Sequence, residues 1–227
     1  YLDLYWLHFW DMITPIEEVL QTLGDLVRAG QIRYFGLSDM PAWYATKMAT
    51  LASAHHVPGP IAMQLEYSLV ERSIEREHLT AALECGMGIT PWSPLAAGFL
   101  AGKYTPKEVG ASGQGRLSGP NPFGNSKFTE HNWHILETLR AVAAEVERPP
   151  AQVALAWASS QPGITSPILG ARTLEQLKDN LASLEIGLTL EQFQALHEMS
   201  ALEPGYNTMM ADIKRSIFGG NDVQGWR

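Results

Sequence analysis

YLDLYWLHFWD, residues 1–11, is a nearly continuous run of apolar and β-favouring residues. Strands of parallel sheets show this pattern because helices cover both of their faces. His8 lies where the strand would end, and α/β enzymes place their chemistry at the carboxyl ends of parallel strands. A histidine that is merely packed in the core fits the pattern as well. The run therefore predicts a buried parallel strand with a candidate catalytic histidine at its end.

Short apolar runs alternate with amphipathic segments along the rest of the chain. Further strands are expected at 32–38, 61–67, 88–93 and 165–169, and helices at 15–30, 41–56, 75–85, 130–147, 150–160, 173–184 and from 189 on. Strands that alternate with helices indicate parallel βαβ units in an α/β fold. About five strands are too few to close a (β/α)₈ barrel but fit its last five units. Residues 1–227 are therefore expected to form one partial barrel domain whose N-terminal strands are missing.

Composition narrows the classes of partner. The net charge is −8, the sequence pI is about 5.3, and no basic tract occurs, which argues against nucleic acid and anionic membranes. The single cysteine, Cys85, excludes an intrachain disulfide framework and a thiolate-rich metal site. No apolar run reaches the roughly 18 residues of a membrane span, and no signal peptide is visible. A cytoplasmic protein without a metal is the expectation.

Two short polar segments follow the second and third expected strands. They are Gly36-Leu-Ser38-Asp39 and Gln64-Leu-Glu-Tyr67. Their serine, aspartate and glutamine side chains are able to hold a planar amide substituent of a ring. Ordinary turn chemistry is the alternative, since serine and aspartate are natural helix caps.

A third segment, Pro91 to Tyr104, combines an aromatic residue with small residues. Trp92 at a strand end offers a flat stacking platform, while the small residues after it let the backbone approach phosphates. Lys103 adds a point charge. A core tryptophan followed by a flexible loop is the alternative. The loop at 95–129 exceeds the roughly 12–15 residues common in compact domains, and such loops are usually functional or disordered.

A fourth segment, Pro167 to Asn180, ends a strand, turns at Gly170 and begins a helix at Thr173. Helix N-termini favour phosphate binding. An arginine just before the helix adds a planar guanidinium group that binds phosphate through two N–H groups. The spacing of Arg172, Gln176 and Asn180 predicts that they project from one face. Thr173-x-x-Gln176 is also a capping-box pattern, and both roles can coexist.

In this order and spacing, the four segments resemble the aldo-keto reductase superfamily over essentially the whole chain, most of all the bacterial branch related to potassium-channel β-subunits. The resemblance implies a (β/α)₈ barrel that binds NADP(H) in extended form without a metal. It implies that His8 is the histidine of a catalytic Asp-Tyr-Lys-His tetrad. The implied cofactor contacts are Ser38, Asp39 and Gln64 at the nicotinamide carboxamide, Trp92 on its ring, Ser93, Pro94, Leu95, Ala96 and Lys103 at the pyrophosphate with Arg116 closing over it, Gly170 and Arg172 at the 2′-phosphate, and Gln176, Asp179 and Asn180 at the adenosine.

The sequence departs from the family pattern in two respects. Asp39 stands where the family commonly has asparagine or arginine, although a carboxylate still accepts from an amide. The other tetrad residues belong to the first three barrel units, which this chain would lack, so the chain alone is expected to be inactive. The expected function is NADP(H)-dependent reduction of a small aldehyde or ketone to an alcohol. The alternative is a nucleotide-sensing subunit of the channel type, and homo-oligomer formation stays open.

Overall fold

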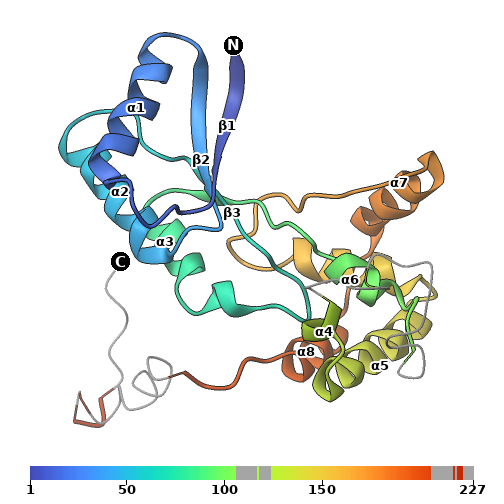
Figure 1. Cartoon of the computed structure of the whole chain (residues 1–227). Coiled ribbons are helices and arrows are strands. Elements are labelled where there is room, and N and C mark those ends of the chain that lie inside the picture. The colour runs from blue at the N-terminus through green and yellow to red at the C-terminus, as the bar shows by residue number, and fades with distance from the viewer. Residues whose placement is uncertain (106–116, 118–123, 206–216, 218, 222–227) are drawn as a thin grey trace.

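The computed structural model of the 227-residue chain describes residues 1–105, 117, 124–205, 217 and 219–221 (Figure 1). Four parallel strands form one sheet in the order β1-β2-β3-β4. The strands are β1 (Leu2–His8), β2 (Ile32–Ser38), β3 (Ala62–Gln64) and β4 (Gly88–Ile89). The predicted α/β class with a parallel sheet is confirmed.

Three helices connect these strands in sequence: α1 (Ile16–Arg28), α2 (Ala42–Ala54) and α3 (His78–Glu84). They lie on one side of the sheet, where their apolar stripes pack on the strands (Figure 1). The core between the layers contains Phe35, Leu37, Met48 and Met63, all fully buried. His8 pairs with Ser38 and Ser38 with Gln64, so the carboxyl ends of the first three strands lie level at one edge.

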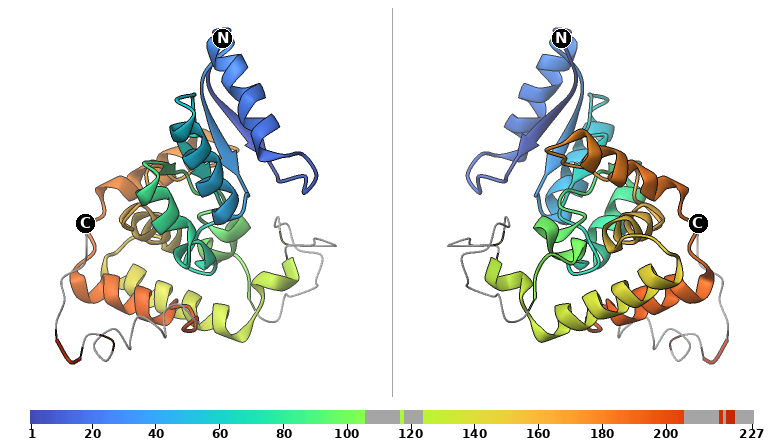
Figure 2. Two further views of the ribbon diagram at one scale, coloured as in Figure 1. Left: turned by 90° about the vertical axis from the view of Figure 1, so that its left-hand side faces the viewer. Right: turned by 90° about the vertical axis from the view of Figure 1, so that its right-hand side faces the viewer.

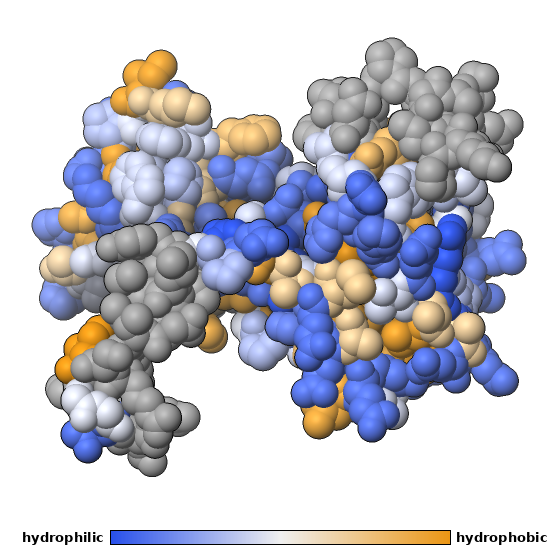
Figure 3. All heavy atoms as spheres, turned by 90° about the horizontal axis from the view of Figure 1, so that it is seen from below, coloured by the Kyte–Doolittle hydropathy of each residue, from blue (hydrophilic) through white to orange (hydrophobic). Residues whose placement is uncertain are grey.

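The second half of the described chain is helical. It contains α4 (Gly124–Lys127), α5 (Glu130–Glu145), α6 (Pro150–Ser159), α7 (Leu174–Leu181) and α8 (Leu190–Met199), with 3₁₀ turns η1 (Ser73–Glu75), η2 (Ala96–Ala101) and η4 (Ala182–Glu185). Helix α5 lies beside α8 and packs on α6 (Figure 2). The face seen from below is mainly hydrophilic, with hydrophobic residues in small separate groups (Figure 3). Within the described residues, no helix is long and apolar enough to cross a membrane.

Strand β1 is not buried, contrary to its sequence pattern. Leu2 is 54% exposed and Tyr5 is 38% exposed. Within the described part of the chain, β1 is the edge of the sheet and pairs only with β2. Apolar patterning indicates that a face is suited to burial, but burial also requires a neighbour that covers it.

The predicted strand at 165–169 is also wrong. Ile164 makes a single parallel bridge to Ile89, and Ile168 N–H donates to the Pro91 carbonyl at 2.7 Å. Pro167 and Pro91 have no N–H to donate, so a continuous ladder cannot form. The segment still runs beside β4, which brings the turn at Gly170 toward the carboxyl edge of the sheet.

Gly36 of β2 lies directly under the indole ring of Trp6. A Cβ at this glycine would come within 2.3 Å of the ring. Trp6 and Gly36 are register partners in the β1–β2 ladder. The absence of a side chain at Gly36 therefore lets the Trp6 ring lie flat across the neighbouring strand.

Two helices, α5 and α8, begin at residues whose side chains cap them. Thr189 and Gln192 form the predicted capping box at the start of α8. Thr129 caps α5 by accepting the Asn132 N–H at 3.1 Å. The predicted helix at 75–85 divides into η1 and α3, and the one at 173–184 divides into α7 and η4.

Candidate functional site

A hollow of about 500 Å³ opens at the carboxyl edge of the sheet. Its apolar lining includes Trp10, Met40, Leu65 and Ile74. Its acidic lining consists of Asp39, Glu66 and Glu71. The turns after β1, β2 and β3 all reach this hollow, which is the place where parallel α/β sheets collect functional groups.

Asp39 and Trp92 meet at the wall of this hollow. The indole Nε1–H of Trp92 donates to Asp39 Oδ1 at 3.0 Å. Asp39 has a left-handed backbone, with φ 51°, and its N–H donates to the Gln64 carbonyl at 3.0 Å. The fully buried Ser38 hydroxyl faces Gln64 Oε1 at 3.5 Å. The structure therefore brings together the four residues for which the family resemblance implies contact with a nicotinamide group.

The turn after Trp92 has an unusual backbone. Ser93, Ala96, Ala97 and Gly98 have φ values of 55°, 48°, 54° and 96°. Left-handed backbone costs a non-glycine residue roughly 1 kcal/mol, and such strain gathers at functional sites. The Ala97 N–H donates to Ser93 Oγ at 3.2 Å, which closes the turn.

Two features make this turn suitable for an anion. Within the described residues, the N–H groups of Ser93 and Leu95 have no hydrogen-bond partner. A Cβ on Gly98 would meet no atom within 4 Å, so the space above that residue is open. Backbone N–H groups beside left-handed residues form concavities that bind anions. The pyrophosphate prediction for Ser93, Pro94, Leu95 and Ala96 thus has a fitting backbone, while Lys103 is exposed and Arg116 lies outside the described residues.

The turn before α7 is held by its own side chains. Thr173 Oγ1 accepts the Gln176 N–H at 3.2 Å, and Gln176 Oε1 accepts the Arg172 N–H at 2.9 Å. The predicted capping box is thus realised with Arg172 in place of Thr173 as the second donor. The buried Asn180 amide approaches the Gly170 carbonyl at 3.5 Å, whereas Asp179 is exposed.

Arg172 does not share a helix face with Gln176 and Asn180. It precedes the N-cap residue Thr173, so only Gln176 and Asn180 belong to α7. The predicted single face is therefore wrong, because the i, i+4 rule applies only within a helix. The Arg172 side chain is exposed beside the Gly170 turn.

His8 lies at the end of β1, beside the hollow but outside its lining. Its ring packs against Phe9, with 4.2 Å between ring centroids, and the residue is exposed. Asp11 does not contact it. Instead, Asp11 Oδ1 accepts the N–H groups of Ile13 and Thr14, each at 3.0 Å.

Thr14 is likewise a turn residue. Its hydroxyl donates to Asp11 Oδ2, and this bond, followed by the backbone N–H bonds, lowers the pKa of the Asp11 carboxyl. Helix α1 begins at Ile16 with Pro15 as its N-cap residue, and no side chain caps it. The Thr14 hydroxyl is therefore engaged in this turn and does not cap α1.

Sequence reasoning missed the charged residues behind the hollow. Lys127 is only 6% exposed, and its Nζ lies 2.9 Å from Glu66 Oε1 and 4.0 Å from Glu71 Oε2. His78 also lines the hollow, where its Nε2 lies 3.1 Å from the Met40 carbonyl oxygen. The sequence signalled neither role, because each partner comes from a distant part of the chain.

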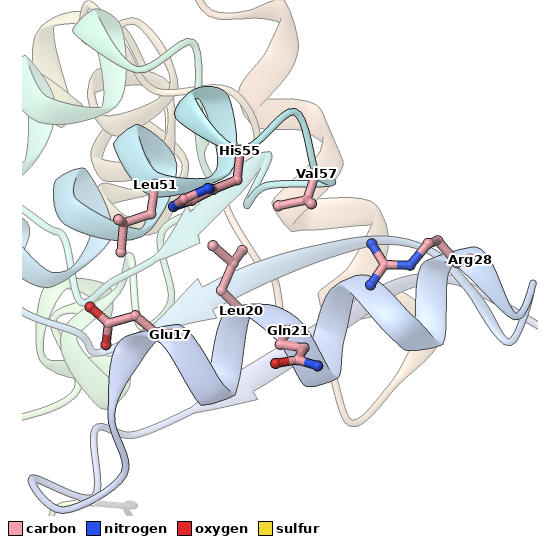
Figure 4. Close-up of a pocket in the computed structure, with 7 residues that line it drawn as sticks. All are labelled: Glu17, Leu20, Gln21, Arg28, Leu51, His55 and Val57. Carbon is pink, nitrogen blue, oxygen red and sulfur yellow. The ribbon is translucent and has the colours of Figure 1, made fainter.

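A second pocket lies between α1 and α2, away from the strand ends (Figure 4). It measures about 210 Å³ and combines apolar residues such as Leu20 and Leu51 with Glu17, Arg28 and His55. No strand-end residue reaches it. We therefore place the candidate site at the carboxyl edge, where the described residues show no cluster of three metal-ligating side chains.

Comparison with known proteins finds a family model and several relatives that match the chain. A sequence model described as "Aldo/keto reductase family" matches residues 1–201. The "Uncharacterized oxidoreductase YrpG" of Bacillus subtilis is 34% identical over 199 residues, which are 88% of this chain and 58% of that protein. The "Probable aryl-alcohol dehydrogenase AAD4" of Saccharomyces cerevisiae is 31% identical over 210 residues, which are 92% of this chain and 63% of that protein.

A relative of another kind matches equally well. The "Probable voltage-gated potassium channel subunit beta" of Oryza sativa is 32% identical over 187 residues, which are 82% of this chain and 57% of that protein. The chain thus spans less than two thirds of the length of these three relatives.

Proposed function

The chain belongs to the aldo/keto reductase family, and from this premise we propose that it binds NADP(H) at the carboxyl edge of its sheet and serves the reduction of a carbonyl compound. The observation that carries the proposal is the Asp39–Trp92 contact beside the left-handed turn at Ser93. In this proposal the open parallel sheet is an arc of a (β/α)₈ barrel. Relatives named aryl-alcohol dehydrogenases and the apolar wall of the hollow favour an aromatic carbonyl substrate.

The residues around Asp39 would bind and orient the nicotinamide. Trp92 offers a rigid stacking face whose tilt is fixed by its bond to Asp39. Within the described residues, Asp39 Oδ2 has no partner, so it is an acceptor for the carboxamide NH₂. Ser38 and Gln64 supply further short polar groups at the same place. When bound, the cofactor supplies a hydride for the carbonyl carbon.

His8 would act on the substrate side. Its imidazole stands at the end of β1, level with Ser38, and is accessible from solvent. A ring N–H there is able to donate a hydrogen bond to the carbonyl oxygen, which orients the substrate and favours negative charge on that oxygen.

The phosphates would be held by backbone and by exposed cations. The Ser93–Gly98 turn presents N–H groups to the pyrophosphate, with Lys103 nearby in sequence. The Arg172 side chain is exposed beside the Gly170 turn, where its guanidinium would form a fork for a 2′-phosphate. This arrangement favours NADP(H) over NAD(H).

Titration with both cofactors tests the proposal, with quenching of tryptophan fluorescence as the readout. We expect Arg172→Ala to weaken NADPH binding about tenfold, because it removes one charge-assisted contact, and to leave NADH binding unchanged. Lys178→Ala is the matched control, since Lys178 is an exposed cation of the same segment. Equal affinities for the two cofactors in the wild-type chain would contradict the assignment.

A nucleotide-sensing subunit is the second candidate, favoured by the similarity to the rice channel subunit. Both candidates bind the cofactor, so binding does not separate them. In a version of the protein that also carries the aspartate, tyrosine and lysine of the tetrad, an enzyme would oxidise NADPH in the presence of an aromatic aldehyde and would lose turnover in His8→Ala with an unchanged cofactor Kd. A sensor would bind NADPH with the same affinity and show no turnover.

A further inference from the structure

We propose that Lys127 is a positioning residue that neutralises the acidic rim of the hollow and thereby allows an anionic dinucleotide to bind there. The inference rests on the proposed function, because it concerns the same site. Asp39, Glu66 and Glu71 all line the hollow. Without a nearby cation, these carboxylates would repel a ligand that carries several phosphate charges.

The geometry places the Lys127 ammonium where it acts on this rim. Its Nζ is 2.9 Å from Glu66 Oε1 and 4.0 Å from Glu71 Oε2, so one cation serves two carboxylates. The lysine is almost completely buried, and an ion pair shielded from water is screened by salt far less than a surface pair. Glu66 and Glu71 keep more exposure, so their charge is felt in the hollow.

The surrounding structure fixes Lys127 in this position. Its carbonyl accepts the Asn132 side-chain amide at 3.0 Å, and Thr129 caps α5 directly after it. The next residue, Phe128, stacks on Trp133 with ring planes 7° apart and packs on Phe99 of η2. The Lys127 backbone is therefore held against α5 and, through Phe128, against η2.

Glu66 also connects this cation to the cofactor platform. The backbone of Glu66 forms a parallel bridge with Trp92, and the Trp92 indole donates to Asp39. An unpaired Glu66 would thus place a full negative charge next to the proposed nicotinamide position. Neutralisation by Lys127 removes that charge without filling the hollow.

The test measures NADPH affinity of the full chain by tryptophan fluorescence at about 20 mM and about 500 mM salt. We expect Lys127→Met to weaken binding roughly tenfold at low salt and by less at high salt, and Lys127→Arg to retain wild-type affinity. Lys127→Met combined with Glu66→Gln should restore binding to within about threefold of wild type. Lys47→Met is the matched control, because Lys47 forms an exposed 3.1 Å pair with Glu17 on the outer helices.

Glu66→Gln alone gives an outcome that misfolding cannot imitate. It leaves Lys127 with less opposing charge, so NADPH should bind severalfold more tightly at low salt. Unchanged affinity in both single variants would overturn the inference. So would a weakening in Lys127→Met that is independent of salt and is not restored by Glu66→Gln, since that result indicates a purely structural role. Failure of the wild-type chain to bind NADPH would instead overturn the proposed function, and this inference with it.

Discussion

Two buried cations in this protein are satisfied in different ways. The Arg72 guanidinium donates to Glu75 through Nε at 2.7 Å and through Nη2 at 2.9 Å. Its Nη1 donates to the His197 carbonyl and to Ser200 Oγ, each at 2.7 Å. Lys127 has one partner at 2.9 Å and a second at 4.0 Å, and both partners line the hollow.

The contrast indicates which buried charge is structural. Every direction around Arg72 is occupied by the protein, including the Trp157 ring, whose centroid lies 5.2 Å from the guanidinium carbon. This closed cluster ties the connection after β3 to the end of α8. The Lys127 cluster faces the hollow through Glu66 and Glu71, so the net charge of the cluster acts on a ligand there. Variants of the closed cluster should alter stability alone.

Arg72→Met should have the largest effect on the free energy of unfolding. It leaves the partly exposed Glu75 carboxylate without its cation, which costs about 3 kcal/mol of unfolding free energy, the lower end of the range for a buried pair. Urea unfolding measures the loss, and Arg76→Met is the control because Arg76 is exposed and its side chain donates to the Glu203 carbonyl at 3.0 Å. A folded Arg72→Met variant whose NADPH binding is selectively weakened would contradict the assignment of a purely structural role to the Arg72 cluster.

Tyr67→Phe should have an intermediate effect on the same cluster. The Tyr67 hydroxyl donates to Glu75 Oε1 at 2.6 Å, and burial, with Glu75 second, raises the pKa of this phenol, so it remains a donor. Loss of a hydrogen bond to a charged group costs about 2 kcal/mol. Tyr34→Phe, at an exposed position, should leave the urea midpoint unchanged. Equal midpoints for the two variants would show that the hydroxyl contributes nothing.

Acidification should lower the stability of the folded protein by the smallest amount of the three changes. Burial, followed by the Arg72 charge, lowers the pKa of His197, so the folded state favours the neutral ring. The folded pKa lies below the unfolded one, so stability is fully present above the unfolded value and falls as the pH drops through it, near pH 6.5. We expect the melting temperature to fall between about pH 7.5 and about pH 5.5, and to fall less in His197→Gln. His134→Gln, at an exposed position of α5, should retain the wild-type pH dependence.

The sequence predicted what local chemistry controls. The capping box at Thr189 placed the start of α8 correctly, and the polar residues after β2 and β3 indicated the edge where Asp39 and Trp92 meet. Prediction from the sequence failed where residues distant in the chain determine the burial or the contacts of a residue. The exposure of β1 depends on which elements cover it, and Lys127 reaches Glu66 across the fold. Neither relation leaves a periodic pattern in the chain.

The packing of Trp6 on Gly36 has a consequence for how related sequences vary. Only one large side chain fits across these paired positions of β1 and β2, because a Cβ on Gly36 would overlap the ring. A larger side chain at one of the two positions therefore requires a smaller side chain at the other. Homologues with a larger residue at position 36 should carry a smaller one at position 6. The two positions should therefore covary so that their summed side-chain volume stays nearly constant.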